Sequence, residues 1–215
     1  MVLGDFIRRL VRLLWGLFLY ALGISLTVNA HIGYAPWDTF HAGIANVANI
    51  SFGTASIVVG LVIIAITLLL QEKIGLGSIL NMFAIGFFLD VILGLEILPV
   101  ARNFLTGLFM LIMGLFVIAL GSYFYMDSGF GAGPRDSLMV ALTRRTKLPI
   151  GFCRGAIELT ALLCGWRLGG MVGLGTVICG LLTGFCVQLT FKLLKFEATG
   201  VEHQTLAETF ETLRS

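Results

Sequence analysis

Apolar residues in this chain gather in long runs separated by short polar or glycine-containing segments. A helix needs about 20 mainly apolar residues to cross a bilayer. Six stretches meet this requirement, at about residues 12–30, 54–70, 77–97, 105–126, 152–169 and 173–192. Two further segments, 36–48 and 135–147, are only weakly apolar and too short to span, and each is introduced by a proline. The pattern predicts an all-α, polytopic membrane protein with six transmembrane helices and two short additional helices.

The two halves of the chain match when one is shifted by 98 residues. Seven glycines of the first half then fall on glycines of the second half without a gap, Pro36 falls on Pro134, and Asp38 falls on Asp136. Chance matching of apolar residues is common in membrane proteins, but joint registration of Gly, Pro and Asp is not. The predicted division is a first membrane repeat, a second membrane repeat and an acidic cytoplasmic tail, at residues 1–98, 99–192 and 193–215.

The number of spans in each half predicts how the halves insert. Three spans per repeat place the second repeat upside down relative to the first, and cytoplasmic loops are rich in Lys and Arg. With the N-terminus inside, only Arg102 and Arg167 fall outside. The basic residues that fall on or near the cytoplasmic side are Arg8, Arg9, Arg12, Lys73, Arg135, Arg144, Arg145, Lys147, Lys192 and Lys195. We therefore expect two inverted-topology repeats, with both termini in the cytoplasm.

The short segments share the motif Gly-x-x-Pro-x-Asp, at residues 33–38 and 131–136. Gly lets the chain turn back after a span, and Pro suits the first position of a helix. Asp two residues later lies beside unpaired N–H groups and the positive end of the helix dipole. Two readings stay open: a capped helix lying on the membrane surface, or a re-entrant half-helix lining a site near mid-membrane. The candidate substrate-binding or gating residues are Pro36, Trp37, Asp38, Pro134, Arg135 and Asp136.

Asp90, Arg154 and Glu158 are ionisable residues inside predicted spans. Such a charge costs about 2.5–3.5 kcal/mol on insertion scales, so it usually faces protein or water. Arg154 precedes Glu158 by four residues and shares its helix face, which favours pairing. These three residues are candidates either for an intramembrane ion pair that fixes packing or for a proton- or substrate-coupling carboxylate.

Composition and motifs exclude several classes of function. The chain is 58% hydrophobic and 12% charged, whereas soluble domains carry about 25% charged residues, so its partner is the lipid bilayer. A net charge of +2 is too small to indicate nucleic acid. His31 and His41 flank the first motif without a third ligand nearby, so no metal is predicted. No nucleophile triad or nucleotide fingerprint is present, and we expect neither an enzyme nor a cofactor.

Several of these motifs resemble a family, the YczE-like bacterial integral membrane proteins, loosely grouped with the YyaS and YitT proteins. The resemblance rests on Ala-x-x-Gly-x-x-Pro-Trp-Asp (30–38), Gly-x-Gly-Pro-Arg-Asp-Ser-Leu-Met (131–139), Thr-Arg-Arg-Thr (143–146), the Arg154/Glu158 pair and Gly-Gly-x-x-Gly-x-Gly-Thr (169–176). It covers nearly all of residues 7–192. It implies a location in the bacterial inner membrane and supplies no substrate. The positions carried over are Pro36, Trp37, Asp38, Pro134, Arg135, Asp136, Arg154 and Glu158.

The predicted architecture favours a small-solute transporter, with proton coupling as an option and a site between the two repeats. A passive pore formed where two half-helices meet is one alternative. A non-transporting scaffold or regulator acting through the basic loop and acidic tail is another, and homo-oligomerisation is left open. The alternatives predict different structures. Two proline-led segments around one polar cavity favour transport, whereas two segments lying flat over a dry core favour a scaffold.

Overall fold

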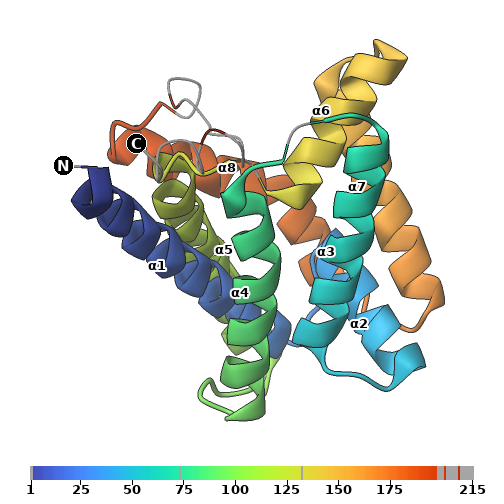
Figure 1. The fold of residues 1–215 in the computed structure, drawn as a ribbon. Helices are drawn as coiled ribbons and strands as arrows, with labels where there is room; N and C mark the ends of the chain where they lie inside the picture. The colour runs from blue at the N-terminus through green and yellow to red at the C-terminus, as the bar shows by residue number, and fades with distance from the viewer. Residues whose placement is uncertain (1, 73, 132, 198–200, 202–207, 209–215) are drawn as a thin grey trace.

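The computed structural model describes every residue except 1, 73, 132, 198–200, 202–207 and 209–215. The described residues form eight α-helices and no strands (Figure 1). In chain order these are α1 (Val2–Asn29), α2 (Pro36–Ala48), α3 (Phe52–Leu69), α4 (Leu76–Gly94), α5 (Phe104–Asp127), α6 (Pro134–Thr146), α7 (Ile150–Arg167) and α8 (Leu174–Leu193). The all-α prediction is confirmed, and both proline-led segments are helices. Most of the predicted acidic tail, 193–215, lies outside the described residues.

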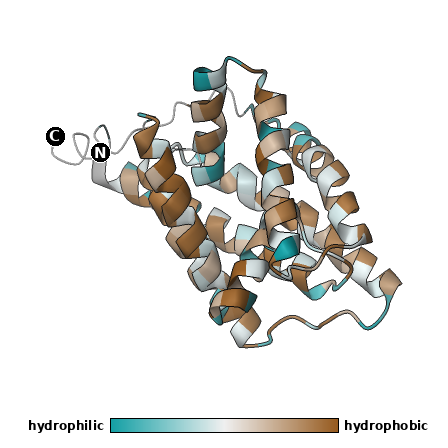
Figure 2. Ribbon diagram, turned by 90° about the vertical axis from the view of Figure 1, so that its right-hand side faces the viewer, coloured by the Kyte–Doolittle hydropathy of each residue, from teal (hydrophilic) through white to brown (hydrophobic). Residues whose placement is uncertain are grey.

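Five helices in the described chain are long and apolar enough to cross a membrane: α1 from Gly4, α3, α4, α5 and α8. Figure 2 shows hydrophobic residues following these long helices over much of their length. The remaining predicted span, 152–169, does form a helix, α7, of 18 residues, but it carries Arg154, Glu158 and Arg167 and is not one of the five. The structure therefore supports a multi-pass membrane protein without confirming the count of six spans.

Helix boundaries in the second half follow those in the first at the 98-residue offset. Helices α6, α7 and α8 begin 98 residues after α2, α3 and α4 respectively. Gly33 and Gly131 have φ values of 119° and 118°, a region that L side chains rarely adopt. The residue before each of these glycines accepts a 2.7 Å hydrogen bond from the start of a long helix. The Gly175 N–H of α8 donates to the Ile32 carbonyl, and the Gly77 N–H of α4 donates to the Phe130 carbonyl.

Helices α1 and α5 form the central contact between the two halves. Gly16 and Gly23 of α1 face Gly114 and Gly121 of α5, so the backbones approach closely. A methyl group added to Gly23 would lie 2.7 Å from the Gly114 carbonyl oxygen, and one added to Gly121 would lie 2.6 Å from the backbone nitrogen of Tyr20. Small residues permit this approach in membrane helices.

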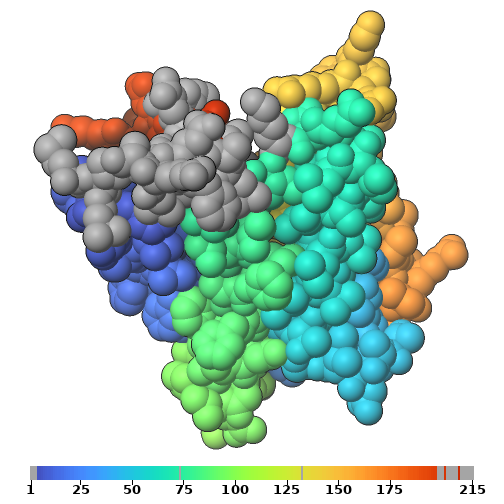
Figure 3. Space-filling view, viewed as in Figure 1, coloured from blue at the N-terminus to red at the C-terminus, as the bar shows by residue number. Residues whose placement is uncertain are grey.

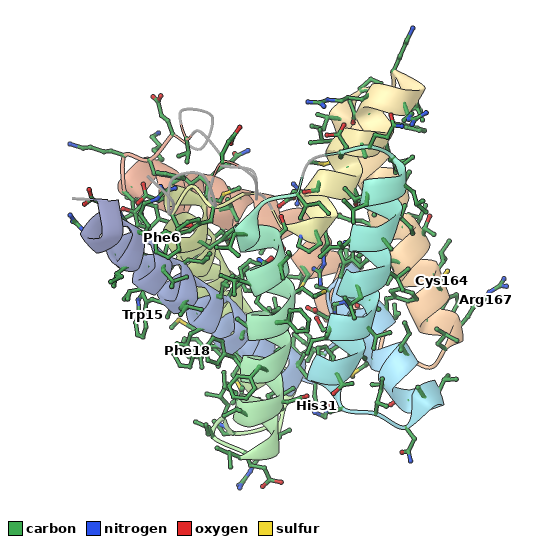
Figure 4. All side chains as sticks on the ribbon, viewed as in Figure 1. Phe6, Trp15, Phe18, His31, Cys164 and Arg167 are labelled. Atoms are coloured by element: carbon green, nitrogen blue, oxygen red, sulfur yellow. The ribbon has the colours of Figure 1, made fainter. Side chains whose placement is uncertain are left out.

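One end of the bundle is basic. In Figure 1 the start of α1, the α3–α4 turn and the C-terminal ends of α5, α6 and α8 lie at the same end. Arg12 forms an ion pair with Asp127 there, and Arg144 pairs with Glu72 at 3.0 Å. We call this the basic end. Figure 4 shows His31 and Arg167 away from it, and Arg167 points out of the bundle.

Candidate functional site

A cavity of about 430 Å³ lies inside the bundle and is lined by residues from all eight helices. Pockets that hold small molecules usually measure about 300–1,000 Å³. Eight of the nine residues predicted from the sequence as site residues line this cavity: Pro36, Trp37, Asp38, Pro134, Arg135, Asp136, Arg154 and Glu158. The ninth, Asp90, does not. The first turns of α2 and α6 therefore meet at one polar cavity, although 98 residues separate them in the chain.

Arg135 connects the two proline-led helices. Its guanidinium lies over the Trp37 ring, 4.8 Å from the centroid, and Arg135 Nη2 lies 3.4 Å from His41 Nε2. A guanidinium has only donors, so His41 Nε2 is the acceptor and the proton of the neutral imidazole lies on Nδ1. That nitrogen lies 3.8 Å from Asp38 Oδ1. The arrangement links a carboxyl, an imidazole and a guanidinium across the two halves of the chain.

The Asp38 carboxyl and the His41 ring are the most buried ionisable groups in this linkage. Asp38 is 4% exposed and His41 is 2% exposed. Neither Asp38 Oδ1 nor His41 Nδ1 has a hydrogen-bond partner among the described residues. Buried polar atoms are normally hydrogen-bonded, and an exception indicates strain, a catalytic or binding role, or an unseen water or ion. Asp38 Oδ1 is therefore available to accept a proton or a donor group of a ligand, and the His41 Nδ1–H is available to donate a hydrogen bond to a ligand in the cavity.

Tyr125 fixes the second proline-led helix. Its hydroxyl donates to Asp136 Oδ2 at 3.3 Å and accepts from the Gly133 N–H at 3.2 Å. Gly133 is the residue before α6, and no side chain caps this helix. The end of α5 thus holds the start of α6 in place and orients the Asp136 carboxyl.

Arg154 and Glu158 form the ion pair that their spacing predicted, with Arg154 Nε 3.0 Å from Glu158 Oε1. Their side chains are 59% and 34% exposed, so they lie at the rim of the cavity rather than in its depth. In a membrane, a charged pair beside a polar cavity avoids contact with lipid tails.

The structure corrects the prediction made for Asp90. It was expected to join a coupling group or an intramembrane ion pair, but it forms no ion pair with a described residue and lies outside the cavity. Instead Asp90 accepts hydrogen bonds from the Ser51 hydroxyl at 2.6 Å and the Gly53 N–H at 2.7 Å. A carboxylate that accepts bonds from the start of a neighbouring helix satisfies N–H groups that the helix itself cannot. Asp90 therefore joins α4 to the beginning of α3.

Sequence reasoning did not place Tyr20, Tyr125 or Asn81 in the cavity wall, which each of them lines. Tyr in membrane helices usually lies at the membrane surface. Tyr20 is near the middle of α1, and this position within an apolar run was the available signal. Nothing in the sequence distinguished Tyr125 from an interfacial tyrosine, because its partners at the start of α6 are set by the tertiary fold.

The cavity chemistry suits a polar small molecule. Its wall offers carboxyl, imidazole, guanidinium, phenol and amide groups over an otherwise apolar surface. Among the described residues, no group of three or more His, Cys, Asp or Glu side chains could hold a metal ion. The arrangement can bind a polar ligand or a proton between the two halves of the chain.

An all-helical bundle with several membrane-spanning helices around a polar cavity defines the chain as a multi-pass membrane protein. The chain belongs to the family described as Family of unknown function (DUF6198), whose profile matches residues 7–192. This membership agrees with the resemblance to YczE-like proteins.

Three relatives show how far the similarity extends. The chain is 34% identical over 177 residues to the Uncharacterized membrane protein YczE of Bacillus subtilis, covering 81% of each chain. It is 31% identical over 182 residues to an Uncharacterized protein of Haemophilus influenzae, covering 85% of this chain and 83% of the other. The Uncharacterized protein YyaS of Bacillus subtilis is 25% identical over 182 residues, or 84% of this chain and 90% of the other. No solved structure matches. The relatives support a bacterial membrane location.

Proposed function

We propose that this protein is a small-solute transporter of the bacterial inner membrane, built from two inverted-topology repeats with the solute site between them. The observation that carries the proposal is the meeting of α2 and α6 at one polar cavity, where both first turns contribute a carboxyl group. Transporters of this kind place short or broken helices, one from each repeat, around a site near the bilayer midplane. Two surface helices over a dry core, as in the scaffold alternative, would not line a common cavity.

The proposed topology has six spans: the five long apolar helices and α7, which is the fifth in chain order. Its 18 residues suffice for about 27 Å at 1.5 Å per residue. Its two mid-helix charges, Arg154 and Glu158, pair with each other at the cavity rim, which lowers the cost of placing them in the membrane. The basic end faces the cytoplasm by the positive-inside rule, so both the N-terminus and the acidic tail are cytoplasmic.

Proton coupling is the version of this function that the cavity favours. Asp38 and His41 face each other across 3.8 Å at the base of the cavity, each with an unpartnered atom. His is the side chain whose ordinary titration lies nearest neutral pH, and buried carboxyls commonly carry protons in transporters. A proton held by Asp38 and His41 would alter the charge beside Arg135 and so alter the affinity of the cavity for solute.

The test is uptake by liposomes containing the purified full-length protein. Liposomes are incubated with a mixture of bacterial metabolites with and without an imposed proton gradient, and the solutes recovered inside are identified by mass spectrometry. We expect one or a few solutes to accumulate, chemically unchanged, since no enzymatic conversion is proposed. Asp136→Asn and Glu158→Gln should reduce this uptake. Glu96→Gln is the matched control, because Glu96 is exposed and lies outside the cavity.

The possible outcomes separate the proposals. Saturable uptake that falls in both cavity variants and persists in Glu96→Gln supports transport. Uptake that neither saturates nor responds to the gradient indicates a passive pore. Unchanged uptake in Asp136→Asn and Glu158→Gln removes these residues from the mechanism. No uptake of any solute, together with a specific protein partner recovered from the membrane, favours the scaffold.

A further inference from the structure

Helices α3 and α4 form a closed seam. Gly53 of α3 and Gly86 of α4 lie against each other, so that a methyl group added to Gly53 would overlap the Gly86 carbonyl oxygen. About two turns further along α3, a methyl added to Gly60 would lie 2.5 Å from the Met82 side chain. Figure 3 shows the two helices side by side on one face of the molecule. Ala55 and Val59 of α3 are buried beside this contact.

Asp90 locks this seam. Its carboxylate accepts hydrogen bonds from the Ser51 hydroxyl and the Gly53 N–H, with the Thr54 hydroxyl at 3.3 Å. All three donors belong to the first residues of α3 or the residue before it, at the end of the bundle away from the basic end. The lock therefore holds α3 and α4 together on the face opposite the proposed cytoplasmic side.

The equivalent seam in the second half is open. Helices α7 and α8 carry Gly151, Gly155, Gly180 and Gly184, and a methyl group added to any of these four would meet no other atom of the described residues within 4 Å. The 98-residue offset pairs Gly151 with Gly53 and Gly184 with Gly86, the two glycines in closest contact in the closed seam. One pair of equivalent helices is packed, and the other is apart.

The cavity lies on the open side. Helix α4 lines it with Asn81, Met82 and Ile85, which precede Gly86 and so lie on the basic-end side of the Gly53–Gly86 contact. Helix α8 lines it at the equivalent positions and also further along, at Gly184 and Val187, toward the basic end. The cavity therefore reaches further toward the basic end along α8 than the equivalent positions of α4 would allow, since Gly86 of α4 is packed on α3.

We propose that the α7–α8 seam is a gate, and that it closes by packing the α7 glycines on the α8 glycines while the α3–α4 seam opens. The cavity would then be exposed to the other side of the membrane. This inference rests on the proposed transport function and describes how the same site changes sides. The present structure is the state open toward the basic end, and Asp90 holds it.

Residue sizes in the two seams fit this exchange. In the closed seam Gly60 of α3 accommodates Met82 of α4. At the positions 98 residues later, Glu158 of α7 stands in place of Gly60, and Gly180 of α8 stands in place of Met82. The larger residue is therefore on α7 and the glycine on α8, the reverse of the arrangement in α3 and α4. Ile57, which touches Gly86, is replaced by Gly155, so α7 can approach Gly184 as closely as α3 approaches Gly86. The exposed glycines of α7 could alternatively pack against a second copy of the chain. In the first half, however, the equivalent glycine of α3 packs against the next long helix, α4, which favours α8 as the partner of α7.

Cysteine cross-linking in native membranes tests the gate without requiring a solute. A disulfide forms only when the two Cα atoms come within about 4.4–6.8 Å. We expect Gly151→Cys combined with Gly184→Cys to cross-link within one chain under mild oxidation, and the yield to rise several-fold when Asp90→Ala removes the lock. Each single variant controls for pairing with the native Cys153 or Cys186. Gly151→Cys combined with Leu174→Cys, at the far end of α8, should give no product.

A second variant keeps the test independent of folding defects in Asp90→Ala. Gly180→Leu adds bulk to open space and should preserve abundance and monodispersity, yet it should abolish the intrachain cross-link because α7 can no longer approach. Gly94→Leu is the matched control, since Gly94 also meets no described atom within 4 Å and lies outside both seams.

Each outcome either supports or overturns the gate. An intrachain product that increases with Asp90→Ala and disappears with Gly180→Leu supports it. No product in any background, or a product only between two chains at twice the mass, overturns it. Cross-linking without solute uptake would support movement of α7 toward α8 and reject the transport proposal. Solute uptake without cross-linking would support transport and reject the α7–α8 gate.

Discussion

The pair Gly53 and Gly151 offers a sharp test of the packing described above. Each is the second residue of its helix, α3 or α7, and the two occupy equivalent positions in the repeats. Replacing either with alanine therefore changes the local helix by a similar amount. The favourable effect of Ala over Gly is about 0.5–1 kcal/mol in a helix interior and smaller in a first turn. Any larger difference between the variants reports what surrounds each glycine.

The surroundings predict opposite results. At Gly53 the new methyl would overlap the Gly86 carbonyl oxygen and lie 2.6 Å from the Asp90 carboxyl carbon. Overpacking costs about 1–3 kcal/mol, and weakening the Gly53 N–H to Asp90 bond costs about 1.5–3 kcal/mol more. We expect Gly53→Ala to lower the free energy of unfolding by about 2.5–6 kcal/mol in total. At Gly151 the methyl meets no described atom within 4 Å, so Gly151→Ala should be neutral or stabilising by up to about 1 kcal/mol.

The measurement is equilibrium unfolding of the purified protein in mixed detergent micelles, followed by tryptophan fluorescence. The chain has three tryptophans, which suffice as probes. Equal losses of stability in Gly53→Ala and Gly151→Ala would refute the reasoning, because they would mean that α7 is packed as tightly as α3 in the resting protein. A neutral Gly53→Ala would equally refute the close α3–α4 contact.

Three further predictions concern the cavity and the central contact. Tyr125→Phe should cost about 1–3 kcal/mol in unfolding experiments, because the buried Gly133 N–H loses its acceptor; Tyr34→Phe is the control, since the Tyr34 hydroxyl forms no hydrogen bond with a described residue. Asp38→Asn should leave stability unchanged or raise it by about 1 kcal/mol, since it neutralises a buried carboxyl with an unpartnered oxygen, and should nevertheless reduce liposome uptake; a large loss of stability would show that the carboxylate is structural. Gly121→Ala should separate α1 from α5 and lower the yield of folded protein, as measured by size-exclusion fluorescence, whereas Gly180→Ala should not.

Much of the candidate site could be predicted from the sequence, because polar and charged residues within apolar stretches would cost free energy if they faced lipid. Proline and aspartate at the start of two short segments indicated helix starts, and those starts do line the cavity. The spacing of Arg154 and Glu158 was enough to predict their ion pair, because residues four apart share a helix face. Asp90 was misassigned because its partners, Ser51 and Gly53, lie about 40 residues away in the chain and nothing local indicates the contact. Tyr125 was missed although its partners, Gly133 and Asp136, lie only 8 and 11 residues away, because the turn between α5 and α6 decides that they meet.

The sequence by itself determined the class of protein, the helices and the equivalence of their boundaries in the two halves. These depend on local properties: the length of apolar runs, the restricted backbone of proline and the permissive backbone of glycine. Only the tertiary structure decided which glycines are in contact. Gly53 and Gly151 are equivalent in the sequence, yet one is packed against Gly86 and the other faces open space. The relative position of two helices depends on all their packing partners at once, so two copies of one pattern can adopt different arrangements in a single chain.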